Sequence, residues 1–473
     1  MTRAVGLSGE EQEGFDGLSL IIGMGATGLS CARFLKSIGA EFAVADTRTA
    51  PAMLDVFRAE FPGVEIELGD LREAFLARAQ RLIVSPGISV KTDAIAQAKS
   101  AGVEVTGDIA LFAQRVKKPI VGVTGSNGKS TVVAMLASIL RAAGRSFGLG
   151  GNLDGENFKP ALDLLSEEPK ALYVLELSSF QLETTPFLNA EAVALLNLSQ
   201  DHMDRYVDAS EYLSAKQNIF HGAKQVCVNA NDALTFPLDP ATATVCYSTQ
   251  GAVEGGFGID GVKGARALSF NGSAFLAVER MRVAGEHNIA NALAASALAH
   301  AIGVSLESIA QGIADFNGLP HRCQWVAKVN NVDYFNDSKG TNVGSTLASV
   351  VGLGEHIAAS TGGKLVLIAG GEGKGADFSP LAPAIGDFVR NVILIGRDAK
   401  LIAECLEQDS YAHEVTFAQS MEEAIEQATA AAQAGDAVLL SPACASFDMF
   451  DNFQHRGDVF ATRVREKTYE DED

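Results

Sequence analysis

The fold of this chain is decided by the stretch Thr124-Gly125-Ser126-Asn127-Gly128-Lys129-Ser130-Thr131. An apolar run before it, Ile120–Val123, predicts a buried strand, and a helical pattern follows over 129–143. Backbone N–H groups of such a turn bind phosphate oxygens, the lysine contacts the terminal phosphates, and a hydroxyl reaches Mg²⁺. Val123 stands where the strict pattern has its first glycine, so the turn is a variant. A glycine-rich turn with a chance lysine is the alternative, but the flanking elements favour a nucleotide site.

A second glycine turn, Gly23-Met-Gly25-Ala-Thr-Gly28, also lies between an apolar run and a helical pattern. Asp46 ends the next predicted strand, 18 residues past Gly28. This spacing is typical of dinucleotide-binding folds, in which glycines let a pyrophosphate approach and the carboxylate binds a ribose hydroxyl. A tight turn without a ligand is the alternative. The pattern alone does not separate NAD from another diphosphate nucleotide.

Three further residues of the middle block carry candidate chemistry. Glu176 ends an apolar run, where a carboxylate suits Mg²⁺, although a capping or salt-bridged glutamate fits equally well. His202, in Asp201-His-Met-Asp204, is either a metal ligand or an ordinary loop histidine. Lys216 lies in a helical pattern over 210–220 and, taken alone, reads as a surface lysine.

Polar turns also follow two predicted strands of the last block. Asn336–Asn342 follows one strand and precedes a helix, so its residues are helix caps or ligand contacts, with Thr341 or Asn342 as the cap. Gly370–Gly375 is a second glycine and lysine turn without the helix-opening hydroxyl of a triphosphate site. Its Lys374 suits a carboxylate substrate.

Apolar runs alternate with helical patterns along the chain, which predicts the α/β class with largely parallel sheets. Gly251–Val283 is glycine-rich with short alternating runs, which predicts a small antiparallel β insertion. Lys117-Lys118-Pro119 and Gly318–His321 indicate hinges. We therefore expect three domains, at 1–117, 118–318 and 319–473.

Composition excludes several classes of protein. The 473 residues carry 37 basic and 58 acidic side chains, so the net charge is 37 − 58 = −21, which disfavours nucleic acid as a partner. The six cysteines are far apart and form no CxxC, so we expect reduced thiols rather than a disulfide or zinc scaffold. The polar N-terminus leads us to expect no signal peptide, and Asn288–Leu306 predicts a packed helix rather than a membrane span.

The order and spacing of these motifs resemble those of the Mur ligases, ATP-dependent amide-bond-forming enzymes of peptidoglycan synthesis, over nearly the whole chain. The shared segments are Thr124–Thr131, Glu176, Asp201–Asp204, Gly285–Ala292, Gly318–Arg322 and Asn336–Lys339. Within the last block, Thr341-Asn342, Ser441–Ser446 and Asn452–Gly457 are similar to the branch of the family that adds D-glutamate. Gly340 departs from the alanine usual there, and Cys323-Gln-Trp325 has an unfamiliar form.

The resemblance implies an N-terminal Rossmann-like UDP-binding domain, a central P-loop ATPase-like domain with a small β insertion, and a C-terminal Rossmann-like domain that binds the amino acid. It implies a cytoplasmic bacterial ligase that adds D-glutamate to UDP-N-acetylmuramoyl-L-alanine through an acyl phosphate, in cell wall synthesis and thus in cell shape and division. We expect a monomer without membrane partners.

The resemblance also implies roles for the nucleotide-site residues. The ATP contacts would be Gly125, Ser126, Asn127, Gly128, Lys129, Ser130, Thr131, Asn288, Arg322 and Asp337. Two Mg²⁺ ions would be held by Ser130, Thr131, Glu176, His202 and Lys216, the lysine carrying a CO₂-derived carbamate. The catalytic residues would be Lys129, Glu176, His202 and Lys216.

The substrates are assigned in the same way. The UDP-sugar would contact Ala26, Thr27, Asp46, Thr47, Arg48, Ser85, Gly87, Asn152 and His202. D-Glutamate would contact Thr341, Lys374, Ser446 and Phe453.

Three rival hypotheses remain. A folylpolyglutamate synthase shares the central architecture but lacks the separate N-terminal domain. An NAD-dependent dehydrogenase predicts NADH binding without ATP turnover. A nucleotide-gated binding protein without chemistry would not need Glu176.

Overall fold

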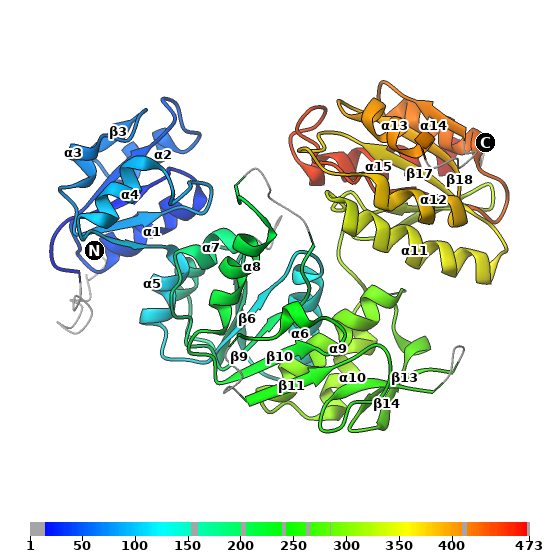
Figure 1. The fold of residues 1–473 in the computed structure, drawn as a ribbon, viewed down its shortest axis with the longest axis horizontal. Coiled ribbons are helices and arrows are strands. Elements are labelled where there is room, and N and C mark those ends of the chain that lie inside the picture. Colours follow the sequence, from blue (N-terminus) through cyan, green and yellow to red (C-terminus); the bar gives the residue numbers. More distant parts are fainter. Residues whose placement is uncertain are drawn as a thin grey trace. The chain divides into compact units, whose positions relative to one another are not determined.

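The structure is a computed structural model that describes residues 15–152, 159–199, 205–238, 243–261, 265–283, 285–408 and 414–470. The chain divides into two compact units, the first made of Met1–Tyr247 with Ala294–Ile309 and the second of Ser248–Leu293 with Ala310–Asp473. Parallel sheets flanked by helices recur in both units (Figure 1), so the predicted α/β class is confirmed.

The first unit begins with a sheet of five parallel strands in the order β3-β2-β1-β4-β5. The strands are β1 (Ser19–Ile22), β2 (Phe42–Asp46), β3 (Ile66–Leu68), β4 (Arg81–Val84) and β5 (Glu104–Thr106). The helices are α1 (Ala26–Ser37), α2 (Leu54–Glu60), α3 (Glu73–Leu76), α4 (Asp93–Ser100) and α5 (Asp108–Arg115). The strand order reverses between β1 and β4, and a crevice forms at the carboxyl ends of strands at such a point.

Both faces of this sheet are buried. Ile21 of β1 packs in the same cluster as Leu35 of α1, whereas Leu20 and Ile22 pack in a cluster with Ile95 of α4. Successive side chains of a strand point to opposite faces, so this alternation places helices on each side. The two layers hold the strand ends, and the turns that follow them, in fixed positions.

The first unit also contains six strands of a second, nine-stranded sheet, and these six are parallel in the order β11-β10-β9-β6-β8-β7. The strands are β6 (Ile120–Thr124), β7 (Phe147–Gly151), β8 (Leu172–Glu176), β9 (Ala192–Leu195), β10 (Gln225–Asn229) and β11 (Ala243–Tyr247). The helices of this part are α6 (Lys129–Ala142), α7 (Ser179–Glu183), α8 (Ala209–Gln217) and the short 3₁₀ turns η3 (Ala161–Ser166), η4 (Asn218–Phe220) and η5 (Ala233–Thr235). Helices α9 (Glu286–Ala301) and α10 (Leu306–Asp315) each have residues in both units.

The second unit contains the predicted β insertion, which is confirmed as an antiparallel meander. Its elements are β12 (Phe257–Asp260), β13 (Ala267–Phe270), β14 (Ser273–Ala277) and the 3₁₀ turn η6 (Val278–Arg280). A six-stranded sheet of the same unit has the order β15-β16-β20-β17-β18-β19, in which only the β15–β16 pair is antiparallel. Its strands are β15 (Gln324–Val329), β16 (Val332–Asn336), β17 (Leu365–Gly370), β18 (Val389–Ile395), β19 (Glu414–Phe417) and β20 (Ala437–Leu440).

Helices cover both faces of this last sheet, and Figure 1 shows β17 and β18 between α12 and α14. Leu367 of β17 packs with Leu353 of α11, while Ile368 packs with Ile425 of α14 and Phe460 of α15. The helices are α11 (Val343–Ser360), α12 (Ala382–Phe388), α13 (Ala399–Gln408), α14 (Met421–Ala431), α15 (Phe453–Glu470) and the 3₁₀ turn η7 (Ser379–Leu381).

The strand predicted before the 124–131 turn coincides with β6, and the strand predicted before Asn336–Asn342 coincides with β16. Strands β3, β7, β10, β11, β15 and β19 were not predicted, because they are short or carry glycine and polar residues. The predicted domain boundaries at 117/118 and 318/319 each fall between two sheets and remain predictions.

Candidate active site

A cavity of about 420 Å³ lies at the carboxyl ends of β1, β2 and β4, the crevice that the strand order indicates. Its lining residues come from the turns after these strands and from the second sheet of the same unit. They are Gly23, Gly25, Ala26, Thr27, Asp46, Thr47, Arg48, Ser85, Pro86, Gly87, Ile88, Gly151, Asn152 and Gln181. The structure therefore brings together all eight described residues predicted to hold the UDP-sugar. The ninth, His202, lies outside the described residues.

Asp46 organises the floor of this cavity. Its Oδ2 accepts hydrogen bonds from the backbone N–H of Met24 at 2.6 Å and from Nη2 of Arg48 at 2.8 Å, and its Oδ1 accepts from Nε of Arg48 at 2.8 Å. Burial raises the pKa of Asp46, but the donors from Arg48 and Met24 outweigh it, so the pKa lies below its ordinary value. The carboxylate is thus ionised and fixed in position, as a partner for hydroxyl groups must be.

The glycines of the first turn serve different needs. A Cβ on Gly28 would lie 1.9 Å from the carbonyl oxygen of Gly23, so glycine lets helix α1 pack against β1. A Cβ on Gly25 would meet nothing within 4 Å, although Gly25 lines the cavity. No side chain caps the N-terminus of α1 at Gly25. A diphosphate can therefore approach these N–H groups without displacing protein atoms.

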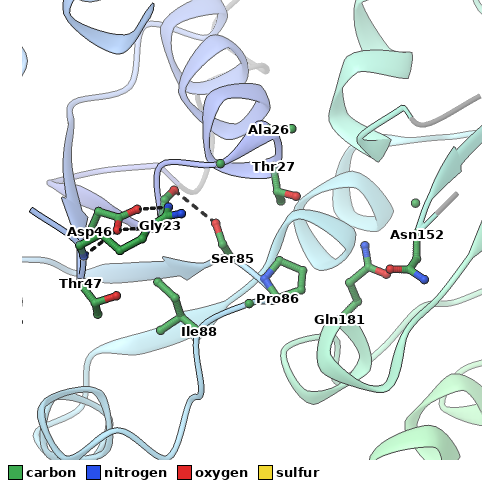
Figure 2. Close-up of a pocket in the computed structure, with 14 residues that line it drawn as sticks. Gly23, Ala26, Thr27, Asp46, Thr47, Ser85, Pro86, Ile88, Asn152 and Gln181 are labelled. Atoms are coloured by element: carbon green, nitrogen blue, oxygen red, sulfur yellow. Dashed lines mark hydrogen bonds and ion pairs between the residues drawn. The ribbon is translucent and has the colours of Figure 1, made fainter. Parts of the chain in front are cut away.

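The opposite wall of the cavity is built by Asn152 and Gln181, which Figure 2 shows across from Asp46 and Thr47. Gln181 belongs to a capping box: Ser178 Oγ accepts from its N–H at 3.2 Å, and its Oε1 accepts from the N–H of Ser178 at 3.1 Å. The predicted sites did not include Gln181, although the Ser-x-x-Gln spacing was available as a signal.

The second glycine turn, between β6 and α6, is held by residues of a neighbouring strand end. Asn197, just after β9, accepts from the N–H of Asn127 at 2.9 Å and donates to its carbonyl oxygen at 3.0 Å. Ser126 Oγ accepts from the N–H of Ser199 at 2.9 Å. Gly128 begins α6 in the left-handed region, with φ 84° and no side-chain cap. These contacts preorganise an open helix N-terminus, which binds anions.

Two lysines meet at this turn. Lys129 Nζ donates to the carbonyl oxygens of Gly125 and Ser126 at 2.8 and 2.9 Å. Lys216 Nζ donates to the same carbonyl of Gly125 at 2.9 Å and lies 4.7 Å from the ring centroid of Tyr212. Lys216 is only 2% exposed, so the prediction of a surface lysine from its local sequence is wrong. Burial of an ammonium group is costly and indicates a function.

Glu176, at the end of β8, faces the first turn of α6. Its Oε2 accepts from Ser130 Oγ at 2.6 Å, and its Oε1 accepts from Asn152 Nδ2 at 3.2 Å. The residue is 1% exposed and does not cap a helix. A carboxylate and a hydroxyl are hard oxygen ligands of the kind that Mg²⁺ prefers, so Glu176 and Ser130 fit that ion beside the phosphates. Thr131, predicted as an alternative ligand, is also buried in this turn of helix.

In the second unit, Asp337 follows β16 and is buried. Its Oδ2 accepts from Ser349 Oγ and Ser441 Oγ, both at 2.7 Å, and its Oδ1 accepts from the N–H of Cys323 at 3.1 Å. Burial outweighs these donors and raises its pKa to about 6. The close packing around Gly340 leaves no room for a side chain, because a Cβ there would lie 2.7 Å from Ser441 Oγ and 2.8 Å from Asp337 Oδ2.

Buried Arg456 of α15 connects two loops of this unit to that helix. Its guanidinium donates to Ser338 Oγ at 2.9 Å, to the carbonyl oxygen of Ser338 at 2.8 Å and to that of Cys444 at 3.1 Å. Burial lowers the pKa of Arg456 to about 10, which leaves it cationic at neutral pH. The sequence analysis did not single it out.

The predicted D-glutamate residues lie at the carboxyl ends of the strands of this unit. Ser338 Oγ donates to the carbonyl oxygen of Phe453 at 2.8 Å, and Lys339 Nζ lies 4.0 Å from the Phe453 ring centroid. Ser446 is buried in the loop after β20, whereas Thr341 is half-buried before α11. Lys374 is exposed with φ 51°, a left-handed conformation that is uncommon outside glycine.

The remaining predicted ATP residues also lie in the second unit. Asn288 opens helix α9, its N–H donating to the carbonyl of Gly285 at 3.0 Å. Arg322 lies between His321 and Cys323, which have φ 59° and 47°, so two left-handed residues fix this turn. Asn342, one of the two predicted caps, is the N-cap of α11 and accepts from the N–H of Ser345 at 2.8 Å.

Among the described residues, no cluster of three or more His, Cys, Asp and Glu side chains is placed to hold a metal ion. None of the helices described is long and apolar enough to cross a membrane. All six cysteines are free, as predicted.

Three family models match the chain in succession. Residues 18–107 match the N-terminal domain of a MurD-like Mur ligase, residues 123–299 match a Mur ligase middle domain, and residues 321–444 match the glutamate ligase domain of Mur ligases. The UDP-N-acetylmuramoylalanine–D-glutamate ligase of Pseudomonas syringae pv. tomato is 47% identical over 450 residues, which are 95% of this chain and 98% of the relative.

Solved structures resemble the fold at lower identity. MurF from Acinetobacter baumannii matches with a TM-score of 0.61 and 16% identity, covering 96% of this chain and 98% of its own. A bifunctional folylpolyglutamate synthase/dihydrofolate synthase matches with a TM-score of 0.54 and 18% identity, covering 75% of this chain and 93% of its own. The folate enzyme leaves a quarter of this chain unmatched, whereas MurF spans nearly all of it.

Proposed function

The chain belongs to the Mur ligase family, and from this premise we propose how it uses ATP to join D-glutamate to UDP-N-acetylmuramoyl-L-alanine in peptidoglycan synthesis. One observation supports the proposal above the others. Asn152 lines the cavity of the first sheet and also donates to Glu176, which accepts from Ser130 at the start of α6. The sugar-nucleotide cavity thus adjoins the triphosphate turn within one unit.

The reaction has two steps. An oxygen of the alanyl carboxylate attacks the γ-phosphorus of ATP, the bond to the β-phosphate oxygen breaks, and ADP leaves. The amine of D-glutamate then attacks the carbonyl carbon of the acyl phosphate, loses a proton, and expels inorganic phosphate to leave an amide. Lys129 and the N–H groups of the turn 125–131 neutralise charge on the transferring phosphoryl group, and most of the rate enhancement comes from positioning and electrostatics.

Mg²⁺, when bound, neutralises phosphate charge and orients the phosphoryl group. Ser130, Thr131 and Glu176 are the residues that would hold it, since they present oxygen ligands at the first turn of α6. We propose a second ion near His202 and Lys216. His202 lies outside the described residues, so the support for this second ion comes from Lys216 alone.

We propose that Lys216 carries a carbamate formed with CO₂. Its burial supports this role, because removal from water disfavours the ammonium ion and only the neutral amine reacts with CO₂. The product is a carboxylate-like oxygen donor, which suits Mg²⁺ where a lysine does not. The present hydrogen bond to Gly125 places the side chain beside the phosphate turn.

In the second unit we propose that Asn288, Arg322 and Asp337 serve ATP and that D-glutamate contacts Thr341, Lys374, Ser446 and Phe453. The exposed Lys374 is the residue that tests this assignment, because an ammonium group there suits a carboxylate. Lys374→Ala should raise the KM for D-glutamate about tenfold and leave the KM for the UDP-sugar unchanged. An unchanged KM for D-glutamate would move the amino-acid site elsewhere.

The decisive experiment measures phosphate release by the whole protein with Mg²⁺ and ATP. Release should require both UDP-N-acetylmuramoyl-L-alanine and D-glutamate, and the amide product should form in equal amount. Release at the same rate with ATP alone would argue against ligation. NADH binding without ATP turnover would instead favour the dehydrogenase hypothesis. We further propose that the enzyme works as a cytoplasmic monomer.

A further inference from the structure

Behind one wall of the sugar-nucleotide cavity lies an arginine to which neither the motifs nor the reaction assign a role. Arg205 follows β9 in the chain, and its side chain is 10% exposed. Its Nη1 donates to the carbonyl oxygen of Pro86 at 2.9 Å, and its Nη2 donates to that of Ile88 at 3.2 Å. Pro86 and Ile88 both line the cavity.

The wall itself is a short turn after β4. Ile88 N–H donates to the carbonyl oxygen of Ser85 at 2.9 Å, and Ser85 Oγ donates to that of Gly23 at 3.3 Å. Ser85 also attaches the start of the turn to β1, because its N–H donates to the carbonyl oxygen of Ile22 at 2.9 Å. Arg205 holds the rest of the turn from outside, through the backbone carbonyl groups of Pro86 and Ile88.

Arg205 is in turn held by α7. Glu183, the last residue of α7, accepts from Arg205 Nη2 at 2.7 Å, and its side chain is 11% exposed. The guanidinium carbon lies 4.1 Å from the ring centroid of Phe180, also in α7. A planar guanidinium with fixed donors can satisfy a carboxylate and two carbonyls at once while stacked on a ring, which an ammonium group cannot do.

We propose that Arg205 is a positioning residue for the UDP-sugar: clamped by Glu183 and Phe180, it fixes the Ser85–Ile88 wall of the cavity in its binding geometry. This inference rests on the proposed function, because it assumes that the cavity receives the UDP-sugar. Arg205 acts only through backbone carbonyls, so it should control affinity for this substrate and not the chemical step. Substrates bound elsewhere should not sense it.

The variant Arg205→Lys keeps the positive charge but loses the two guanidinium nitrogens, Nη1 and Nη2, that donate to the wall. We expect the KM for the UDP-sugar to rise about tenfold, since the half-buried carbonyl group of Pro86 or Ile88 loses its donor, while kcat and the KM values for ATP and D-glutamate change less than about twofold. Calorimetric titration of the UDP-sugar onto the protein without ATP should show the same tenfold loss. Arg78→Lys is the matched control: it breaks a similar arginine fork, to exposed Glu65, with hydrogen bonds of 3.0 and 2.8 Å, and should change nothing.

Glu183→Gln supplies a second variant if Arg205→Lys folds poorly. It keeps an acceptor oxygen but removes the charge, so we expect a smaller loss of UDP-sugar affinity, about threefold. The double variant should be no weaker than Arg205→Lys alone, because both changes act through one clamp. Equal UDP-sugar affinity in wild type and Arg205→Lys, or a common rise of all three KM values, would overturn the inference. A wild-type protein that fails to bind the UDP-sugar would refute the proposed function instead.

Discussion

The first unit contains two glycine turns with the same backbone arrangement but different charged side chains around them. Each follows a parallel strand and opens a helix without a side-chain cap, at Gly25 before α1 and at Gly128 before α6. Around the first turn the nearest charges are Asp46 and its partner Arg48, which hold each other. Around the second, Lys129, Lys216 and Glu176 converge on the turn itself.

This comparison indicates that the backbone of such a turn favours anion binding, whereas the side chains around it determine whether a reaction can be catalysed there. An open helix N-terminus favours phosphate binding, and this is the role that we propose for both turns. Only the second turn can also neutralise the charge that moves when a phosphoryl group is transferred. Variants that act on one turn and not the other therefore test this division.

The largest effect should come from Lys129→Ala, which removes the cation of the second turn. We expect kcat to fall by about 10³-fold or more, because charge on the transferring phosphoryl group loses its stabilisation. Ligation rates under saturating substrates measure it, and UDP-sugar affinity should stay at the wild-type value. Lys99→Ala, at an exposed position of α4, is the control. A Lys129→Ala enzyme that still joined its substrates at full speed would end the assignment of this turn to ATP.

Lys216→Ala should have the next largest effect, a loss of activity of about 10²-fold. Short carboxylic acids added to the variant should restore part of it, because they supply the oxygen donor that the carbamate provides. The measurement is ligation rate against acid concentration, with Lys224→Ala, an exposed lysine paired to Glu191, as the control. Rescue should not occur in Lys129→Ala. Full activity of Lys216→Ala without any acid would remove the carbamate role.

A pair of glycine variants sharpens the account of the first turn. Gly28→Ala places a methyl group against the carbonyl of Gly23, so we expect it to destabilise the fold by about 1–3 kcal/mol. Gly25→Ala meets no protein atom and has an ordinary φ of −100°, so stability should not change. Its methyl group would instead face the diphosphate and raise the KM for the UDP-sugar about tenfold. Thermal melting and KM measured on both variants separate packing from binding, and an unchanged KM for Gly25→Ala would contradict diphosphate binding there.

Sequence predicted those parts of the molecule whose signal is local. The turn 124–131 carries strand, glycines, lysine and helix within a dozen residues, so its place and its conformation could be inferred. Every described residue expected to hold the UDP-sugar lines one cavity. Seven of the eight lie at the ends of three parallel strands that finish at one edge of the first sheet, and Asn152 follows β7 of the second sheet.

Contacts between distant segments could not be predicted in this way. Asn197 clamps the second turn across 70 residues of chain, and Arg205 reaches Pro86 across 119. Neither has a neighbouring motif that reveals its partner. Lys216 shows the same limit, since a helix pattern of mixed polarity does not tell which polar side chain is buried. The family resemblance, and not its local sequence, indicated its function.

The smallest effect that we expect is a difference in how the stability contributions of two buried carboxyl groups, Asp46 and Asp337, depend on pH. The pKa of Asp46 is lowered, so its ionised form stabilises the fold, and that contribution is lost only as the pH falls below the ordinary value of about 4. The pKa of Asp337 is raised to about 6, so its neutral form is preferred and its contribution is lost as the pH rises through 6. Between pH 5 and 8, Asp46→Asn should thus lower the urea midpoint by a constant amount. Asp337→Asn, which stays neutral, should gain stability relative to wild type as the pH rises from about 4 to about 6 and should then keep a constant difference, measured without ATP. A pH-independent difference for Asp337→Asn would mean that its carboxyl group is ionised throughout, and the hydrogen bonds from Ser349 and Ser441 would then outweigh burial there as those from Arg48 do at Asp46.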